Sequence, residues 1–306
     1  MKQLRHLAYI GNQIDPVFDR TIEQAGEFSL QRVDRSRSLV QLGAGLAASH
    51  AIQIDSARSD VPDHLRAAKP LLSQCPDLLV VSASGAGFDT VDVAACTEAG
   101  VIVVNQSGGN RESVAEHTLG LMLSLTKRIG ETDHALRSGS IVNRNTYMGR
   151  ELFGRTIGIV GIGQCGSRTA ELCRGLFSMN VLAFDPYLDA GTIAAHGARK
   201  VELPELLRES DFVSLHCPLN AETAGMIAAA QFAQMKKGAF FVSTARGGIH
   251  DEAALHAALV SGHIAGAGLD VWVEEPPPAA HPLLSLQNVI ASPHTAGVTH
   301  DARHRL

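Results

Sequence analysis

The sequence lacks the features that mark a membrane, secreted or nucleic-acid-binding protein. No apolar run approaches the roughly 18 residues of a membrane span, and the first residues contain no apolar core of a signal peptide. The five cysteines are scattered without a Cys-x-x-Cys pair, which indicates neither a disulfide framework nor a zinc site. A net charge of −5 without a basic stripe gives no sign of a nucleic-acid partner. We expect a cytoplasmic protein with reduced thiols and no metal.

Short apolar runs alternate with helical patterns through most of the chain. Such alternation predicts parallel sheets, and 306 residues suffice for about two domains. We therefore predict an α/β protein with two doubly wound parallel-sheet domains, and leave residues 34–50 unassigned. The expected strands are Leu7–Ile10, Ala51–Ile54, Leu78–Val81, Val101–Val104, Ile157–Ile162, Val181–Phe184, Asp211–Leu215, Ala239–Val242, Ile264–Leu269 and Val289–Ala291, and the expected helices include Val91–Ala99, Glu222–Ala229 and Glu252–Val260.

Residues 156–185 are the stretch most typical of a nucleotide-binding site. The strand expected at Ile157–Ile162 leads into Gly161, Gly163 and Gly166, which have Gly-x-Gly-x-x-Gly spacing. In such a turn the first glycine permits a tight bend and the second lets the backbone approach a pyrophosphate. The third lets the following helix pack closely on the strand. The N–H groups and dipole of that helix would then point at the phosphates.

Asp185 ends the next apolar run, nineteen positions after Gly166. A carboxylate there binds the hydroxyls of the adenine ribose and repels a 2′-phosphate, and Pro186 and Tyr187 bring no arginine to neutralise one. The alternative is an ordinary strand–helix turn, but it does not explain the acid at this distance. We predict NAD rather than NADP, bound by a Rossmann domain of residues 106–293.

Charged side chains directly follow three of the late predicted strands. Arg246, Glu275 and His294 lie just after successive strands, and Asp270 directly follows the second of these strands. Each residue alone is typical of an exposed loop. Because ligands bind beyond the carboxyl ends of parallel strands, we expect all of them at the edge where a nicotinamide would lie. A guanidinium, an acid and an imidazole at that edge indicate hydride transfer.

The run SASGAGFDTVD, residues 82–92, follows an expected strand of the first hundred residues. Gly85 and Gly87 leave little side chain in the way, so main-chain N–H groups there are available to a small anion. The other interpretation is a turn that needs glycine for its backbone angles. The sequence leaves both interpretations open.

A long helical pattern covers Arg111–Ile129. Its apolar residues occupy nearly every face of the helix, which is typical of a helix buried between domains or between subunits. The pattern therefore favours a homodimer.

The motifs SGAGFDTVD, SVAEHTLGLML, LFGRTIGIVGIGQCG, HCPLNAETAGMI, STARGGIHDEAAL, AGAGLDVWVEEP and NVIASPHTAG run in order from Ser84 to Gly297. In this order they resemble the D-2-hydroxyacid dehydrogenase family, which includes phosphoglycerate dehydrogenases, D-lactate dehydrogenases and glyoxylate/hydroxypyruvate reductases. The resemblance implies a flavodoxin-like substrate domain, residues 1–105 plus 294–306, beside the Rossmann domain. It also implies transfer of hydride between NADH and C2 of a small 2-oxo or D-2-hydroxy acid, and a homodimer.

By the same resemblance Arg246, Glu275 and His294 are the catalytic residues. Glu275 is preferred to Glu274 because it lies five residues after Asp270 and directly before a proline, as in the family. Arg246 is expected to bind the substrate carboxylate, His294 to act as general acid or base, and Glu275 to hold the imidazole tautomer. The residues implied at the cofactor are Gly161, Gly163, Gln164, Cys165, Gly166, Asp185, His216, Cys217, Pro218, Thr223, Thr244, Ala245, Asp270 (for the carboxamide) and Gly297, and those implied at the substrate are Ser84, Gly85, Ala86, Gly87 and Arg246.

Two departures and two rival functions accompany this resemblance. The sequence ends at Leu306, so we expect a shorter helix returning to the first domain than family members have, or a truncated chain. No basic residue stands just ahead of Gly85 in the loop of residues 81–89, which argues against a phosphorylated substrate. A formate- or phosphite-type dehydrogenase is one rival, although formate enzymes carry glutamine where Glu275 stands. The other rival is an NAD-sensing corepressor-like binding protein, which would keep the same catalytic residues.

Overall fold

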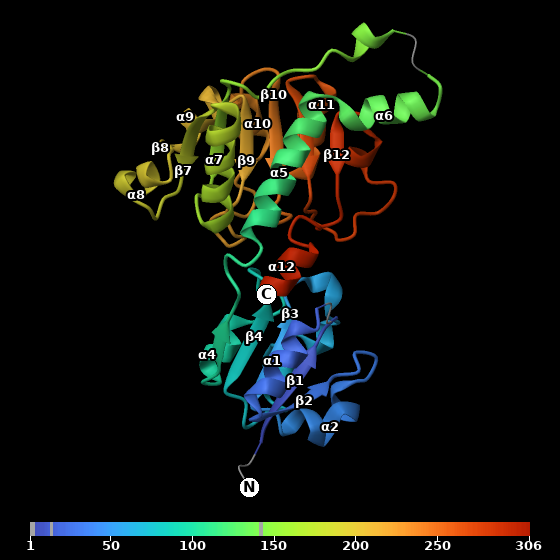
Figure 1. The fold of residues 1–306 in the computed structure, drawn as a ribbon, viewed down its shortest axis with the longest axis vertical. Helices are drawn as coiled ribbons and strands as arrows, with labels where there is room; N and C mark the ends of the chain where they lie inside the picture. Colours follow the sequence, from blue (N-terminus) through green and yellow to red (C-terminus); the bar gives the residue numbers. More distant parts are fainter. Residues whose placement is uncertain (1–3, 13–14, 141–142) are drawn as a thin grey trace. The chain divides into compact units, whose positions relative to one another are not determined.

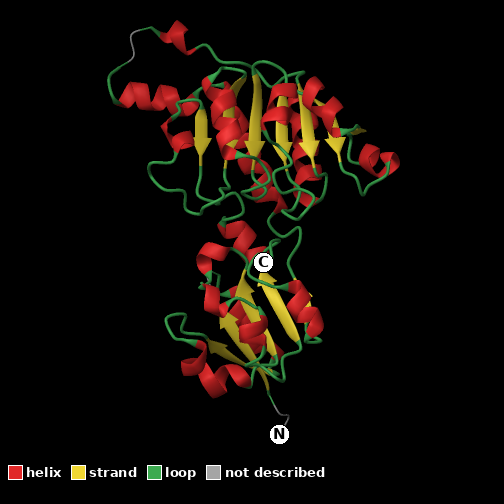
Figure 2. Ribbon diagram, turned by 180° about the vertical axis from the view of Figure 1, so that it is seen from behind, coloured by secondary structure: helices red, strands yellow, loops and turns green. Residues whose placement is uncertain are grey.

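The computed structural model describes residues 4–12, 15–140 and 143–306, and the chain divides into two compact units (Figure 1). Unit 1 contains Met1–Asn110 and Thr299–Leu306, and unit 2 contains Arg111–Val298. Each unit has one parallel sheet with helices on both faces, which Figure 2 shows in yellow and red. The predicted fold class is confirmed. Among the described residues no helix has the length and apolarity needed to cross a bilayer.

Unit 1 has a five-stranded sheet, among the described residues, in the order β2-β1-β3-β4-β5. This is the flavodoxin-like order, in which ligands bind beside the carboxyl ends of β1 and β3, where the strand order reverses. Its elements are β1 (Arg5–Ile10), α1 (Val17–Ala25), β2 (Phe28–Arg32), α2 (Leu39–Ala47), β3 (Ala51–Asp55), α3 (Lys69–Leu72), β4 (Val80–Ser84), α4 (Val93–Glu98), β5 (Ile102–Val104) and α12 (His300–Arg305), with 3₁₀ turns at Arg58–Asp60 and Asp63–Leu65.

Unit 2 has a seven-stranded sheet, in the part of the chain described, in the order β12-β11-β10-β9-β6-β7-β8. The order reverses between β6 and β9, as in a Rossmann fold. Its elements are α5 (Arg111–Thr126), α6 (Ile129–Arg137), β6 (Thr156–Val160), α7 (Gln164–Phe177), β7 (Asn180–Phe184), α8 (Ala190–Ala195), β8 (Arg199–Lys200), α9 (Leu203–Glu209), β9 (Phe212–Leu215), α10 (Ala229–Gln234), β10 (Ala239–Ser243), α11 (Glu252–Val260), β11 (Ile264–Leu269) and β12 (Val289–Ala291), with 3₁₀ turns at Arg144–Tyr147 and Pro282–Ser285.

Alternate residues of the unit 2 strands enter two separate cores. In β10, Phe241 belongs to the cluster under α9, α10 and α11, whereas Phe240 and Val242 belong to the cluster under α5 and α7. Successive side chains of a strand point to opposite faces, so a sheet covered on both sides needs apolar residues at every position. This requirement explains the continuous apolar runs in the sequence.

Two helix predictions for unit 2 are wrong. In the segment predicted as a helix at Glu222–Ala229 the chain forms a turn through Gly225, and α10 begins only at Ala229. The Asn220 side chain accepts the Thr223 N–H (3.0 Å), and Gly225 has φ 65°. The helix predicted at Arg111–Ile129 breaks at Arg128, which has φ 55°, and α6 begins there.

In unit 1 the strand predicted at Leu78–Val81 lies two residues later, as β4. The unassigned residues 34–50 include α2, whose Ser38 forms a capping box with Gln41. The sequence interpretation also missed α1, β2 and β8.

Candidate functional site

The glycine-rich turn between β6 and α7 has three glycines with three different steric roles. Gly161 has φ 85°, and a Cβ there would lie 2.7 Å from the Cys217 amide nitrogen. A Cβ on Gly166 would lie 2.1 Å from the carbonyl oxygen of Gly161, so α7 sits against the turn only because this side chain is absent. A Cβ on Gly163 would meet open space. Space before the first turn of a long helix suits a pyrophosphate.

Asp185 directly follows β7 and is half-buried at the carboxyl edge of the sheet. One carboxylate oxygen accepts the Ile162 N–H (3.2 Å) and the other accepts the Tyr187 N–H (3.1 Å). The Tyr187 hydroxyl in turn donates to Glu222. The backbone therefore holds the acid beside the glycine-rich turn, where the sequence predicted it.

Four of the other residues predicted at the cofactor lie at the same edge of unit 2. Gln164 and Cys165 begin α7, and His216 and Cys217 directly follow β9. Burial lowers the pKa of His216 to about 4, and burial raises the pKa of Cys217 to about 11. At neutral pH both side chains are therefore uncharged beside the turn.

Three further predicted cofactor residues follow β9 and β10. The Thr223 hydroxyl donates to the carbonyl of Pro218 (2.6 Å) and so closes the turn after β9. Thr244 and its neighbour Ala245 are buried just beyond β10, and the Thr244 hydroxyl lies 3.2 Å from that of Thr118 on α5. These contacts place the loops but do not test the predicted roles.

Arg246, Glu275 and His294, the residues predicted to be catalytic, lie on three adjacent loops of unit 2. His294 Nδ1 is 2.8 Å from Glu275 Oε2, and both side chains are about a quarter exposed. Burial alone would raise the pKa of Glu275, but the His294 hydrogen bond, the Trp272 N–H and the charge of Arg246 hold it below its usual value. Glu275 is therefore ionised at neutral pH, and its carboxylate interacts with the charges of both His294 and Arg246.

The loop that carries Arg246 packs directly on the loop that carries Glu275. A Cβ on Gly247 would lie 1.9 Å from the carbonyl oxygen of Trp272, so only glycine permits this approach. The Arg246 guanidinium donates to the carbonyl of Ala245 (2.6 Å). This close backbone packing brings the guanidinium within electrostatic reach of Glu275.

Asp270 directly follows β11, at the carboxyl edge of the sheet. Its side chain is fully buried, and it accepts hydrogen bonds from the Ser292 hydroxyl (2.6 Å) and from the Thr295 and Ala296 N–H groups (2.8 Å each). Its own carbonyl accepts the His294 N–H (2.7 Å). In this conformation Asp270 holds the loop of His294, and its predicted contact with a carboxamide stays a prediction.

Ser292 and His117 contact Asp270 but were not predicted at the site by the sequence interpretation. His117 lies within the helix predicted at Arg111–Ile129, and its Nε2 is 2.9 Å from the Ser292 hydroxyl. The available signal for His117 was a polar residue within a mostly apolar helix. The available signal for Ser292 was its position two residues before the predicted catalytic His294.

In unit 1, the residues predicted to bind substrate follow β4. Gly85 has φ 118°, and its N–H donates to Gln106 Oε1 (2.7 Å). The carbonyl of Ala86 accepts from the Asn105 side chain (2.8 Å). Gly85 thus fits the turn interpretation, because its amide already has a partner, while anion binding by Ser84, Ala86 and Gly87 stays a prediction.

Comparison with known proteins adds to this geometry. Residues 119–296 match the family described as D-isomer specific 2-hydroxyacid dehydrogenase, NAD binding domain. The chain belongs to this family. A D-3-phosphoglycerate dehydrogenase of Archaeoglobus fulgidus is 40% identical over 233 residues, which cover 76% of this chain and 44% of that protein. A glyoxylate reductase of Korarchaeum cryptofilum is 39% identical over 234 residues, 76% of this chain and 70% of that protein.

A solved structure of D-lactate dehydrogenase from Aquifex aeolicus, complexed with NAD and lactic acid, is also similar. It is 28% identical, with a TM-score of 0.82, and the match covers 98% of this chain and 92% of that one. Within this 2-hydroxyacid dehydrogenase family the matched residues form the NAD-binding domain, so NAD is the cofactor of unit 2. The chain spans less than half the length of the phosphoglycerate dehydrogenase that it matches.

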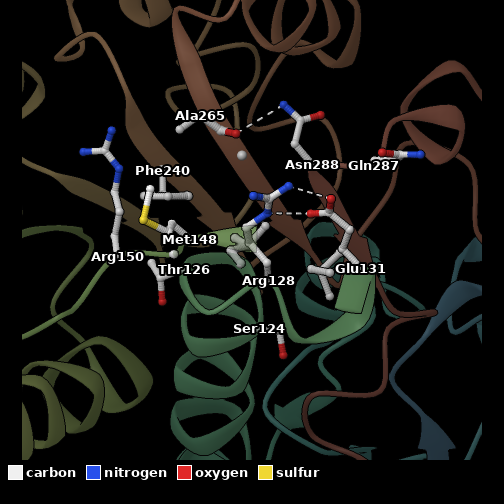
Figure 3. A pocket seen from close by; sticks show the side chains of 14 residues that line it. Ser124, Thr126, Arg128, Glu131, Met148, Arg150, Phe240, Ala265, Gln287 and Asn288 are labelled. Atoms are coloured by element: carbon white, nitrogen blue, oxygen red, sulfur yellow. Dashed lines mark hydrogen bonds and ion pairs between the residues drawn. The ribbon is translucent and has the colours of Figure 1, made fainter. Parts of the chain in front are cut away.

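A pocket of about 370 Å³ in unit 2 lies away from the predicted catalytic residues of this dehydrogenase-family chain (Figure 3). Phe240 and Ala265, near the amino ends of β10 and β11, line it, whereas the catalytic residues follow the carboxyl ends. Five strand residues at about 3.3 Å each separate the two edges. Arg128 and Glu131 both line the pocket and form a bidentate ion pair (2.6 and 2.7 Å).

Proposed function

We propose that this protein is an NAD-dependent oxidoreductase that transfers hydride between NADH and C2 of a small 2-oxo or D-2-hydroxy acid. The observation that carries the proposal is the His294–Glu275 pair beside Arg246, at the carboxyl edge of an NAD-binding sheet. Relatives named glyoxylate reductase and a structure of D-lactate dehydrogenase with NAD and lactic acid support the substrate class.

The residues at the turn fit NAD. The open space at Gly163, the N-terminus of α7 and the acid Asp185 are those that a pyrophosphate and an adenine ribose require. We propose that they bind the cofactor together with the other residues implied at this edge, from Gln164 to Gly297. When bound, NADH supplies the hydride. Asp185 would repel a 2′-phosphate, so the proposal excludes NADPH as the preferred donor.

His294 is oriented to exchange a proton through Nε2. Glu275 is ionised and can only accept, so the Nδ1 atom of His294 carries the proton of their 2.8 Å hydrogen bond. Nε2 is then the atom left to face a substrate. In the reductive direction protonated His294 gives its Nε2 proton to the C2 oxygen, and in the oxidative direction neutral His294 removes it.

Arg246 is proposed to orient the substrate. Its planar guanidinium matches a carboxylate, with which it forms paired, charge-assisted hydrogen bonds. We propose that main-chain N–H groups of Ala86 and Gly87, in unit 1, also bind the substrate acid. Unit 1 would then be the substrate domain.

The first test is oxidation of NADH, followed at 340 nm, with glyoxylate, hydroxypyruvate, pyruvate and phenylpyruvate. We expect turnover with at least one acid, a weak rate with NADPH, and no oxidation of formate or phosphite by NAD. His294→Ala should lower kcat by roughly 10²–10⁴-fold, because it removes the proton donor. Unchanged turnover in this variant would contradict the assigned role. NADH binding without turnover of any acid would favour a corepressor-like binding protein.

The variant Glu275→Gln separates the role of Glu275 in orienting the His294 ring from the role of its negative charge. The amide oxygen still accepts the Nδ1–H, but it no longer stabilises a positive imidazole ring. We expect a loss of about 10–100-fold in reductive kcat, smaller than that of His294→Ala. The pH at which the reductive rate falls to half should also move downward, while KM for NADH stays constant. A pH profile identical to the wild type would argue against the pair.

We further propose a homodimer located in the cytoplasm. The apolar surface of α5 does not support a dimer interface, because α5 packs on α7, β10, β11 and β12 of its own unit. Support comes instead from α6 and the segment Asn143–Phe153, together called the arm. The arm carries four exposed apolar side chains: Ile129, Leu136, Met148 and Phe153. All five cysteines are free thiols, in agreement with a reducing compartment.

A further inference from the structure

His117 on α5 contacts Ser292, on the loop that leads to His294, beside the buried carboxylate of Asp270. Its Nε2 lies 2.9 Å from the Ser292 hydroxyl and 3.6 Å from Asp270 Oδ1. Ser292 also lies 2.6 Å from that carboxylate oxygen. The three side chains therefore form a continuous chain of polar contacts, although His117 and Ser292 are 175 residues apart in the sequence.

The direction of each hydrogen bond follows from the number of protons. The Ser292 hydroxyl donates its single proton to Asp270 Oδ1. The oxygen of Ser292 can then only accept from His117, and Nε2 of His117 must carry a proton. His117 is thus a donor, a role that an apolar residue at this helix position cannot fill.

The loop that this chain of contacts holds has a strained backbone. His294 adopts φ 55°, a left-handed conformation that is uncommon for residues other than glycine. Such a conformation persists only where the surroundings over-determine it. Here Asp270 accepts the backbone N–H groups of His294, Thr295 and Ala296, and the Trp272 indole donates to the carbonyl of Ser292 (3.0 Å). Each of these anchors depends on the placement of Asp270 and Ser292.

We propose that His117 is a positioning residue for His294. By donating to Ser292 it fixes the serine hydroxyl toward Asp270, and Asp270 then holds the backbone that aims the imidazole. The expected loss of rate rests on the proposed function, whereas the expected effect of His117 on the loop of His294 does not depend on it. A small displacement of a proton donor costs rate in the chemical step, while the glycine-rich turn and Asp185, which bind the cofactor, stay in place.

The test compares His117→Leu, which removes the donor, with His117→Gln, whose amide N–H₂ restores one. His196→Leu serves as the matched control, because His196 is exposed at the end of α8, on the β7–β8 side of the sheet (Figure 1). We expect His117→Leu to lower reductive kcat by roughly 10–100-fold with little change in KM for NADH. His117→Gln should stay within about threefold of wild type, and the control should be unchanged.

Hydrogen exchange of the peptide covering residues 292–298 gives a second readout that needs no turnover. We expect its amides to exchange about tenfold faster in His117→Leu and at the wild-type rate in His117→Gln. Ser292→Ala breaks the same contact from the other side. The double variant should therefore be no worse than either single variant, because both remove one interaction.

Equal exchange of this peptide in wild type and in both His117→Leu and Ser292→Ala would overturn the positioning role. Equal losses in His117→Gln and His117→Leu would overturn it as well, because the restored donor would then have no effect. If the wild type turns over none of the 2-oxo acids, the proposed function fails while the exchange result still decides the role of His117. If His117→Leu does not fold, Ser292→Ala and His117→Gln carry the same comparison.

Discussion

At the scale of single residues, His294 and His250 have opposite surroundings in unit 2. His294 is 27% exposed and has a carboxylate partner at 2.8 Å. His250 is 1% exposed, and neither of its ring nitrogens has a hydrogen-bond partner among the described residues. Burial lowers the pKa of His250 to about 4, against a smaller opposing effect of the charges of Glu252 and Asp251. His294 therefore has a partner that orients its ring, whereas His250 remains uncharged at neutral pH.

The buried His250 predicts an acid-sensitive stability. Between about pH 6.5 and pH 4 the unfolded chain binds a proton at this residue and the folded chain does not, so the free energy of unfolding decreases as the pH falls. The full effect is about 3 kcal/mol below pH 4. His250→Leu should flatten this dependence, measured by urea unfolding at pH 7.5, 6.0 and 5.0. The exposed His196→Leu should keep the wild-type slope. Parallel curves for wild type and His250→Leu would refute the assignment.

At the scale of elements, the contact between β6 and α7 decides whether the turn can receive a pyrophosphate. The helix lies so close that a Cβ on Gly166 would be 2.1 Å from the Gly161 carbonyl oxygen. On the same helix, a Cβ on the exposed Gly175 would meet no atom within 4 Å. The two glycines therefore differ in packing although they share one helix.

Alanine at these two positions separates packing from helix propensity. Gly166→Ala should cost about 1–3 kcal/mol of stability, because the helix must move away from the turn. It should also weaken NADH binding by at least about tenfold, measured by fluorescence titration. Gly175→Ala should leave NADH binding unchanged and add up to about 1 kcal/mol of stability, since alanine favours a helix. Equal NADH affinity in the two variants would contradict the proposed role of the turn.

At the scale of the whole molecule, the arm predicts the oligomeric state. Leu136 and Phe153 are 72% and 69% exposed, and large apolar side chains gathered on one segment mark an interaction surface. Light scattering after gel filtration should give about twice the 32.4 kDa mass of one chain. Leu136→Glu combined with Phe153→Glu should yield monomers. Val260→Glu, an equally exposed apolar site on α11, should leave the dimer intact. A monomeric wild type would refute the homodimer.

The sequence by itself determined the elements whose signals are local. The apolar runs at β11 and β12 and the helix α11 were predicted with the bounds observed, because strand and helix periodicity depends on neighbouring residues only. The edge on which Arg246, Glu275 and His294 lie was also predictable. Parallel strands all present their carboxyl ends on one side of the sheet, so residues that follow them lie together.

Only the tertiary structure decided which groups contact one another across long stretches of chain. The amide of Gly85 is occupied by Gln106, the carboxylate of Asp270 serves the loop of His294 rather than solvent, and His117 reaches Ser292. Such contacts depend on how helices pack on a sheet and on which donors remain once buried groups are paired. No periodicity along the chain encodes these pairings. His117 and Ser292, for example, become neighbours only when α5 packs against β11 and β12.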